Sequence, residues 1–491
     1  MSEIDRLVNS CLLPAFAGGD VPPEWVHDAL QNGLSGIAIY GTNLVDDGAT
    51  ARIATSIRET APDALVAIDE EGGDVTRLDY LRGSAYPGNL ALGVVDDVDL
   101  TYSVASSIAA DLVANGVNYN LAPSVDVNSD PKNPVIGVRS FGADPSRVAA
   151  HAVAYIKGMQ DAGIATSAKH FPGHGATVAD SHHALPVIDA DLDTFRRREL
   201  PPFAAAIEAG TTSIMTAHIV FKALDDEQPG TLSRRILHNL LREELGYEGV
   251  LITDALDMQA VAGPYGIAGA AVRAFVAGAD LLLLGSVDGE DYCADIRAGI
   301  AEAIRDGSLD VKVLEAAAAR VEKLRAWAAP AAQTSAGAGR AIDQSVGLVA
   351  ARGAVRAVGT VALAGPATVV NVSAPANLAV GEAHWSLTEQ LREFDLVAGE
   401  IAVTEGGSSV DDVLGSLGGS AAVLVVRDAY RRPWQREWVN AFLGARPETV
   451  LVAIGMPDDE TLATGASVCA FGAGRVNIQA AAEVLAGRTD R

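Results

Sequence analysis

The sequence is poor in cysteine, which limits the kinds of site it can build. Its 491 residues contain only Cys11, Cys293 and Cys469, which are far apart and form no CxxC pair. This usage excludes a disulfide framework and a Cys-rich structural zinc site, and it fits a reducing compartment. Residues 1–20 begin with acids rather than a basic region and hold only a short apolar run, unlike a signal peptide. We therefore expect a cytoplasmic protein.

Positive charge and long apolar runs are also scarce. The chain has 36 Lys and Arg residues against 63 Asp and Glu residues, a formal net charge of −27. Such a field repels phosphate backbones and anionic lipids, so we expect neither a nucleic-acid nor a membrane partner. No uninterrupted apolar segment reaches the roughly 18 residues that a membrane-spanning helix needs. Apolar residues still make up 49% of the chain, which is typical of a globular protein, and its length predicts two domains.

Short apolar runs alternate with longer helix-compatible segments up to about residue 310. The helix-compatible segments include 49–60, 98–115, 146–162 and 192–209. The runs that we expect to form strands are Leu12–Ala17, Gly36–Tyr40, Ala64–Ile68, Val117–Ala122, Ala165–His170, Ser213–His218, Gly249–Thr253 and Asp280–Leu284. Eight β-α units in this order predict an α/β fold with a TIM (β/α)8-type barrel.

The later part of the chain has a similar but shorter pattern. Residues 311–328 predict one more helix, and the Pro- and Gly-containing stretch after it is typical of a linker. Apolar runs at 361–372, 421–426, 450–454 and 468–471 then alternate with helical segments at 434–443 and 477–485. We therefore predict a catalytic barrel in residues 1–328, a linker in 329–342 and a smaller C-terminal α/β sandwich domain in 343–491.

Histidines are concentrated in one short segment. Four of the nine histidines lie between positions 170 and 183, in the run Lys169 to Gly175 and the Asp180-Ser181-His182-His183 sequence after it. Asp180 is close enough to His182 to accept a proton from its imidazole, fix its tautomer and raise its pKa. His182 would then act as an acid and afterwards as a base near neutral pH.

A metal site is the alternative for these histidines. His170 and His174 have an i, i+4 spacing and His182 is nearby, but Pro172 and Gly173 interrupt the helix that would align the first two. We therefore expect no metal and no cofactor. We expect His183 and His218 to serve packing or support.

Asp254 ends the seventh predicted strand. In a TIM barrel this position is at the mouth, where a carboxylate can attack an anomeric carbon and form a covalent glycosyl-enzyme. The alternative is a helix N-cap or a structural ion-paired acid. Asp257 is the nearest competitor but comes after the strand end.

Other polar residues at strand ends suit a ligand rich in hydroxyl groups. Asp69 follows the third strand and can accept two hydroxyls, and Arg77, beyond a glycine pair, can donate to others. Arg139 follows the fourth strand, and Lys169 and His170 end the fifth. In so acidic a chain, a cluster of basic residues is hard to explain as ordinary surface charge. Its members are Arg77, Arg139, Lys169 and His170.

These segments together resemble the NagZ-type β-N-acetylhexosaminidases of glycoside hydrolase family 3. The resemblance rests on the run from Lys169 to His182 and covers about residues 10–325, and the supporting matches are Asp69–Gly73, Arg139–Gly142, Met215–His218 and Thr253–Ala255. It implies Asp254 as nucleophile, the Asp180 and His182 dyad as acid/base, and contacts from Asp69, Arg77, Arg139, Lys169 and His170 to a terminal N-acetylglucosamine. Segment 466–487 looks like the end of that family's α/β sandwich domain.

Two positions depart from the family pattern. Glu70 is found where glutamine is common, and Asp74 where a basic residue is common. Both concern the rim near the sugar site and bear on the preference for the leaving group.

The expected function is a retaining exo-glycosidase that removes terminal β-linked N-acetylglucosamine from chitooligosaccharides or cell-wall fragments, as in cell-wall recycling. A phosphorylase is an alternative, because a neutral histidine base would not repel inorganic phosphate as a carboxylate would. A third alternative is a non-catalytic sugar-binding protein, for which loss of Asp254 or His182 would be the sign. Both residues are present.

Overall fold

The computed structural model describes residues 1–177, 185–285, 288–333, 342–373 and 386–488. These divide into two compact units. Unit 1 comprises Met1–Glu71, Thr101–Ile136 and Gly142–Asp343, and unit 2 comprises Gly72–Leu100, Gly137–Phe141 and Gln344–Arg491. The sequence analysis placed Gly72–Leu100 and Gly137–Phe141 with the barrel, whereas in the structure both segments group with the C-terminal part of the chain.

Unit 1 is built on short, buried, parallel strands, and each of the eight runs predicted from the sequence overlaps one of them. The barrel strands are β1 (Leu12–Leu13), β2 (Gly36–Ile39), β3 (Leu65–Ile68), β4 (Tyr119–Asn120), β5 (Ala165–Phe171), β7 (Ser213–Thr216), β9 (Val250–Ile252) and β10 (Leu282–Leu283). Strands β2-β3-β4-β5-β7-β9 pair in that order, and β1 pairs with β10. A bridge between Ile252 and Leu281 joins β9 to β10, and Ala38 N donates to Pro14 O after β1. These bonds close the circuit, so the predicted α/β barrel is confirmed.

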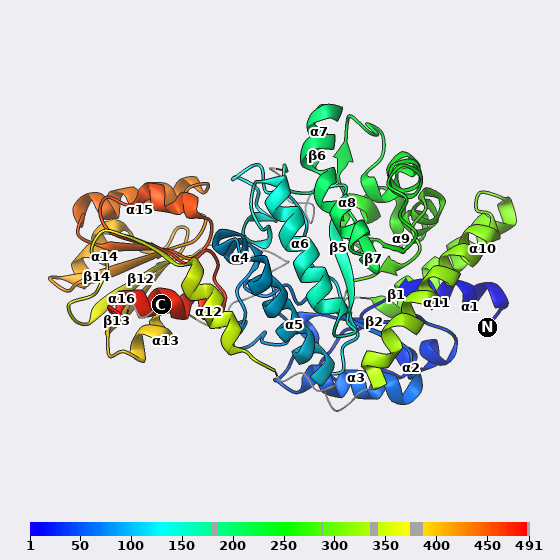
Figure 1. Cartoon of the computed structure of the whole chain (residues 1–491), viewed down its shortest axis with the longest axis horizontal. Helices are drawn as coiled ribbons and strands as arrows, with labels where there is room; N and C mark the ends of the chain where they lie inside the picture. The colour runs from blue at the N-terminus through cyan, green and yellow to red at the C-terminus, as the bar shows by residue number, and fades with distance from the viewer. Residues whose placement is uncertain (178–184, 286–287, 334–341, 374–385, 489–491) are drawn as a thin grey trace. The chain divides into compact units, whose positions relative to one another are not determined.

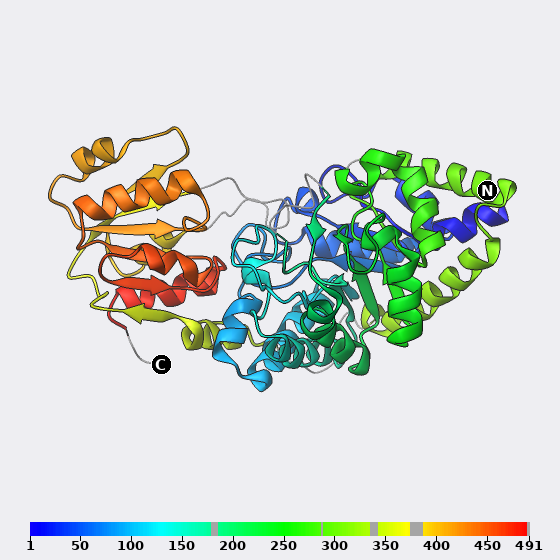
Figure 2. The same cartoon turned by 90° about the horizontal axis from the view of Figure 1, so that it is seen from above.

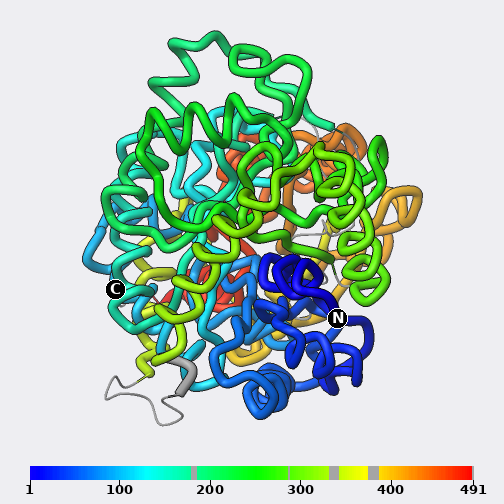
Figure 3. The backbone as a smooth tube through the Cα atoms, turned by 90° about the vertical axis from the view of Figure 1, so that its right-hand side faces the viewer, coloured from blue at the N-terminus to red at the C-terminus, as the bar shows by residue number. Residues whose placement is uncertain are grey.

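Helices surround these strands (Figure 1). Unit 1 contains α1 (Glu3–Asn9), α2 (Glu24–Gln31), η1 (Gly41–Asn43), α3 (Ala49–Thr60), α5 (Val98–Ala114, which begins in unit 2), α6 (Pro145–Gln160), α7 (Leu192–Arg198), α8 (Leu200–Glu208), η3 (Gly230–Leu232), η4 (Arg235–Glu244), α9 (Gln259–Ala277), α10 (Gly289–Asp306) and α11 (Val311–Gln333). A small pair of strands, β6 (Val187–Ile188) and β8 (Val220–Phe221), lies outside the barrel order. Figure 3 shows the dark blue N-terminal segment beside the yellow-green chain that follows the last barrel strand.

The barrel core contains at least one side chain from every barrel strand. Leu13, Ala38, Tyr119 and Met215 are among these, and all are almost completely buried. Alternate residues of a strand point to opposite faces, so one set fills the barrel and the other faces the helices. Helix α11 contributes Val321, Leu324 and Ala328 to the same cluster, and it runs to Gln333, into the segment predicted as a linker.

Helix α9 is the one helix within the described ranges that is long and apolar enough to cross a membrane, by length and composition alone. Its backbone is not continuous, because Gly266 has non-helical angles (φ 65°, ψ 165°) two residues after Pro264. Proline removes a helix hydrogen bond, and glycine tolerates positive φ, so the kink follows from the sequence.

Unit 2 contains a six-stranded sheet in the order β11-β16-β15-β14-β12-β13. Its strands are β11 (Arg356–Val358), β12 (Ala367–Val372), β13 (Val397–Val403), β14 (Ala422–Val426), β15 (Val450–Ala453) and β16 (Ser467–Cys469). Only β11 is antiparallel to its neighbour. The other elements of unit 2 are α4 (Asn89–Val95), η2 (Gly137–Arg139), α12 (Ser345–Ala354), α13 (Leu387–Arg392), α14 (Val410–Leu417), α15 (Pro433–Ala445), η5 (Pro457–Leu462) and α16 (Arg475–Leu485).

The sheet of unit 2 buries both faces. Along β14, Val423 and Val425 belong to one core cluster and Leu424 and Val426 to another. Helices therefore cover both sides of the sheet (Figure 2). The first of these clusters packs against α12, α13 and α16, and the second against α14 and α15.

Candidate active site

The polar residues of interest in unit 1 lie where barrel strands end. Asp69 directly follows β3, Lys169 and His170 are near the end of β5, and Asp254 comes two residues after β9. Because the strands are parallel, their carboxyl ends share one rim of the barrel, where catalytic residues of this architecture lie. The structure therefore places these four residues on the same rim.

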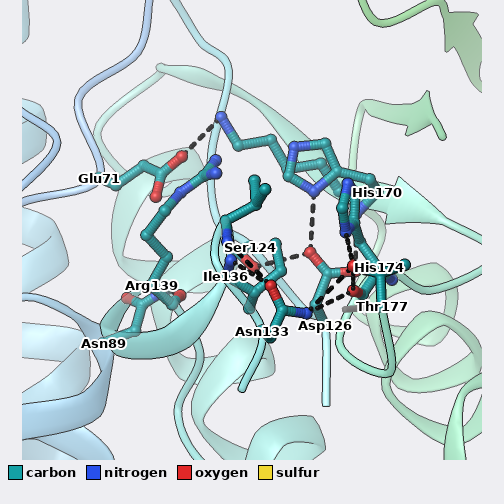
Figure 4. Close-up of polar contacts among 12 residues, drawn as sticks. Glu71, Asn89, Ser124, Asp126, Asn133, Ile136, Arg139, His170, His174 and Thr177 are labelled. Carbon is teal, nitrogen blue, oxygen red and sulfur yellow. Dashed lines mark hydrogen bonds and ion pairs between the residues drawn. The ribbon is translucent and has the colours of Figure 1, made fainter. Parts of the chain in front are cut away.

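Lys169 is a buried cation with two carboxylate partners. Its side chain is 2% exposed, and its Nζ lies 2.7 Å from Asp69 Oδ1 and 2.7 Å from Glu71 Oε1. A buried ammonium group needs such partners, because desolvation strongly disfavours an unpaired charge. Glu71, labelled in Figure 4, was not predicted as a site residue, although it lies in the acidic segment after β3. The lysine thus fixes the side chain of Asp69, a predicted sugar contact.

Asp126 holds the turn that carries His170 and His174. Its carboxylate is fully buried and accepts from His170 Nδ1 at 2.8 Å, His170 N at 3.2 Å, His174 N at 2.7 Å and Ser124 Oγ at 3.0 Å (Figure 4). Burial acts to raise the pKa of Asp126, but the two imidazoles and the hydrogen bonds outweigh burial and lower it. The ionised acid therefore fixes Nδ1 of His170 as the donor.

Asp126 is a functional candidate that the sequence analysis missed. Its partners at His170 and His174 are 44 and 48 residues away in the chain, so no local motif reveals it. The available signal was an acid in the loop after the fourth predicted strand.

His174 is also held by hydrogen bonds with Thr177 and Asn133. Its Nδ1 lies 3.1 Å from Thr177 Oγ1, and its carbonyl accepts from Asn133 Nδ2 at 2.8 Å (Figure 4). The His170 and His174 rings meet edge to face, with centroids 5.6 Å apart. No group of three His, Cys, Asp or Glu side chains within the described part of the chain has the arrangement of a metal site.

Asp180, His182 and His183 lie outside the described residues. The structure therefore gives no account of the predicted acid/base dyad.

Asp254, the predicted nucleophile, is half-buried beside a fixed imidazole. Its Oδ1 accepts from Ala255 N at 2.8 Å. The buried His218 ring binds Ala255 O through Nε2 at 3.0 Å and Thr231 Oγ1 through Nδ1 at 2.7 Å. Burial lowers the pKa of His218, while Asp254 acts in the opposite direction. The neutral ring therefore donates from Nε2 to the carbonyl of Ala255 and orients the peptide next to Asp254.

Asp257, the competitor for the role of nucleophile, has a different contact. Its Oδ1 accepts from Gly285 N at 2.7 Å, and burial raises its pKa. Asp257 thus ties the loop after β9 to the loop after β10. This contact gives it a structural role.

The two predicted sugar-binding arginines group with unit 2. Arg77 is 6% exposed, and its Nη1 donates to Thr76 O at 3.1 Å. Arg139 is 7% exposed, and its carbonyl accepts from Asn89 Nδ2 at 2.7 Å. Asp69, Lys169 and His170 belong to unit 1. The predicted contacts are therefore divided between the two units.

Comparison with known proteins identifies the family to which the barrel part of the chain is similar. Residues 18–324 match the family model described as the glycosyl hydrolase family 3 N terminal domain. The chain belongs to glycosyl hydrolase family 3. The resemblance drawn from the residues around Lys169 and Asp254 is thereby confirmed, as is assignment to the glycoside hydrolases.

Two curated relatives carry related names. β-Hexosaminidase A of Pseudoalteromonas piscicida is 35% identical over 333 residues, which are 62% of this chain and 55% of that protein. The chain thus spans about half the length of this relative. A β-hexosaminidase of Xylella fastidiosa (strain M12) is 36% identical over 280 residues, 56% of this chain and 82% of that protein.

A solved structure matches nearly the whole chain. It is a glycoside hydrolase family 3 β-N-acetylglucosaminidase from Paenibacillus sp. str. FPU-7, with a TM-score of 0.89 and 29% identity over 99% of this chain and 97% of that one.

Proposed function

We propose that this chain is a retaining exo-glycosidase that releases terminal β-linked N-acetylglucosamine from chitooligosaccharides or cell-wall fragments. The placement of Asp254 on the barrel rim, beside the peptide that His218 orients, carries the proposal. The names of the β-hexosaminidase relatives and of the Paenibacillus enzyme support the choice of substrate.

The proposed reaction has two steps. Asp254 attacks the anomeric carbon as the glycosidic bond breaks, and His182, assisted by Asp180, gives its proton to the leaving oxygen. Water then attacks the covalent glycosyl-enzyme, His182 takes the proton from that water, and Asp254 leaves. Two inversions give net retention. The roles of Asp180 and His182 rest on the family resemblance.

Five residues would contact the sugar in this proposal. Asp69, fixed by Lys169, would accept sugar hydroxyls, and His170, fixed by Asp126, would contribute a ring nitrogen. Arg77 and Arg139 would donate to further oxygens of the same sugar.

Product identification tests the reaction class. The purified protein, without added metal, is incubated with an aryl β-N-acetylglucosaminide in phosphate buffer, and the product is identified by mass spectrometry and NMR. Free β-configured N-acetylglucosamine, observed before mutarotation, is expected. N-acetylglucosamine 1-phosphate would instead assign the phosphorylase alternative, and absence of turnover would leave the sugar-binding alternative.

Asp254→Asn tests the nucleophile. Because an amide cannot form the glycosyl-enzyme ester, we expect kcat to fall by roughly 10⁴-fold or more. The matched control is Asp257→Asn, which preserves an acceptor for Gly285 N and should retain most of the activity. Equal losses in the two variants would refute the assignment of Asp254.

A further inference from the structure

Asp74 is a buried acid that holds the segment after β3 on the sheet of unit 2. Its side chain is 2% exposed, its Oδ1 accepts from Ala473 N at 2.7 Å, and its Oδ2 forms an ion pair with Arg427. Arg427 directly follows β14, and Ala473 lies between β16 and α16. One carboxylate thus joins Gly72–Leu100 to the segments that follow β14 and β16, at the carboxyl edge of the sheet.

The groups around Asp74 form a cradle of the kind that binds anions. Gly472, Ala473 and Gly474 precede α16, and Gly474 is the N-cap of this 11-residue helix. A glycine-rich loop before a helix directs backbone N–H groups at a bound anion, and the helix dipole favours negative charge there. Together with the guanidinium of Arg427, this loop suits a carboxylate. The anion that it holds is the chain's own Asp74.

Close backbone contacts show that the fit depends on glycine. A Cβ on Gly474 would lie 2.9 Å from Gly73 Cα, and Gly472 has φ +152° with its hypothetical Cβ 3.4 Å from Asp74 Oδ1. A second bond, from Arg475 Nε to Gly83 O at 3.1 Å, joins α16 to the same segment. The segment therefore contacts both the loop before α16 and the first residue of that helix.

The carboxylates around Arg427 favour its charged form, and thus its ion pair with Asp74. Burial acts to lower the pKa of Arg427, but the carboxylates of Asp74, Asp428 and Asp459 outweigh it and raise the pKa. Asp428 also binds Arg431 at 2.6 Å, and Asp459 accepts from two backbone N–H groups. A basic residue at position 74, common in the family that the sequence resembles, would face Arg427 with like charge.

We propose that Asp74 and Arg427 are positioning residues, which fix the turn from Gly72 to Arg77 and thereby place the Arg77 guanidinium for sugar binding. This inference rests on the proposed function. The turn is compact, because Val75 N donates to Gly72 O at 3.3 Å and Asp79 N donates to Thr76 Oγ1 at 3.2 Å. A shift at Asp74 would therefore move Arg77, three residues later.

The test compares Asp74→Asn with wild type in the full-length protein. Binding of N-acetylglucosamine is measured by calorimetry, turnover of an aryl β-N-acetylglucosaminide by kinetics, and amide hydrogen exchange over residues 72–88 by mass spectrometry. We expect Kd and KM to rise roughly tenfold while kcat changes by less than about twofold, because a contact made equally in ground and transition states is weakened. Exchange over 72–88 should rise. Arg427→Gln provides a second variant that leaves the buried acid in place.

The control is Glu460→Gln. Glu460 pairs with Arg356 in the same unit and is 11% exposed, but its partners lie outside Gly72–Leu100. This variant should keep the wild-type Kd, KM and exchange over 72–88, even if its unfolding temperature falls. It distinguishes the effect of losing any ion pair in unit 2 from the effect of losing the contacts of Asp74 with Arg427 and Ala473.

A double-mutant cycle with Arg77→Ala decides whether Asp74 acts through Arg77. On the Arg77→Ala background, Asp74→Asn should change Kd by less than about twofold, since the group that it positions is already gone. Full additivity, or an unchanged Kd in Asp74→Asn alone, would overturn the inference. If wild type neither turns over nor binds the sugar, the proposed function fails. In that case hydrogen exchange alone tests whether Asp74 holds the segment. An unchanged exchange rate over 72–88 in Asp74→Asn would show that it does not.

Discussion

Asp126 is the residue on which the geometry around His170 and His174 depends. In Asp126→Asn, an amide N–H would face the Nδ1–H of His170, so the ring would change its tautomer or turn away. We expect kcat/KM for an aryl β-N-acetylglucosaminide to fall roughly 10²-fold, because small misplacements of binding groups have effects of that size. Steady-state kinetics checks this, and ¹⁵N NMR reports the tautomer of His170.

Ser124→Ala is the matched control for Asp126. It removes one hydroxyl donor to the same carboxylate but leaves His170 and both backbone donors in place. The fall in kcat/KM in Ser124→Ala should be several times smaller than the fall in Asp126→Asn. Equal kcat/KM values in Asp126→Asn and wild type would show that His170 does not depend on this acid.

Part of the candidate site could be predicted from the sequence, because its residues follow predictable strands. Asp69, Lys169 and Asp254 could each be placed at the barrel rim from an apolar run that ends just before or beside them. Asp126 and Glu71 could not be assigned in this way, since their importance comes from partners far along the chain. Burial of the Lys169 side chain creates the need for Glu71, and sequence alone does not reveal that burial.

In the barrel and in the six-stranded sheet of unit 2, the strands with both faces buried were predictable. β3 and β14 read as unbroken apolar runs, which is typical of parallel strands covered on both sides. β11 and β13 were missed because they are the edges of their sheet: the three residues of β11 are exposed, and along β13 exposed residues alternate with half-buried ones up to the buried Val403. The segment 192–209 was predicted as one helix but forms α7 and α8, with Pro201 and Pro202 in the first turn of α8.

The junction of α7 and α8 contains Glu199, whose side chain is fully buried. Its Oε1 accepts from Arg198 Nε at 2.5 Å, while its Oε2 has no hydrogen-bond partner among the described residues and lies against Gly173 of the turn held by Asp126. Burial raises the pKa of Glu199 to about 7; Arg198 acts to lower it, and Asp126 acts to raise it. The folded chain therefore holds this proton more tightly than the unfolded chain, whose reference value is 4.5.

Glu199→Gln should consequently change the pH dependence of stability. The contribution of Glu199 is fully present below pH 4.5 and is lost as the pH rises through about 7, because the folded state binds the extra proton over that window. We expect the variant to gain stability over wild type progressively across this range, by up to about 3 kcal/mol above pH 7. Urea unfolding at a series of pH values measures the difference.

Glu244→Gln is the control for Glu199→Gln. It removes a carboxylate that is 44% exposed and paired with Arg196, so the change in stability should be small at every pH. A flat difference between Glu199→Gln and wild type from pH 4 to 8 would show that folding does not raise the pKa of Glu199.

At the scale of the whole molecule, the two units are interleaved along the sequence. The barrel was predictable because each β-α unit repeats locally, whereas the membership of Gly72–Leu100 in unit 2 depends on contacts such as Asp74 with Ala473, 399 residues apart. Leu90, Ala91 and Val138 likewise belong to the core cluster of the C-terminal sheet. No periodicity in the sequence encodes such pairings, so a single boundary near residue 328 was the natural prediction.

Truncation after Asp343 tests whether Gly72–Leu100 depends on the C-terminal part of the chain for its folded conformation. The barrel cluster draws only on residues of unit 1, so the shortened chain should keep the far-UV circular dichroism of a folded barrel. Gly72–Leu100 would lose Arg427, Ala473 and the apolar surface that buries Leu90 and Ala91. We therefore expect limited proteolysis to cut the truncated chain within 72–100 at least about tenfold faster than the full chain, because such opening follows lost burial and hydrogen bonding. The same cutting rate in both proteins, with the barrel folded, would mean that this segment is held by the barrel after all.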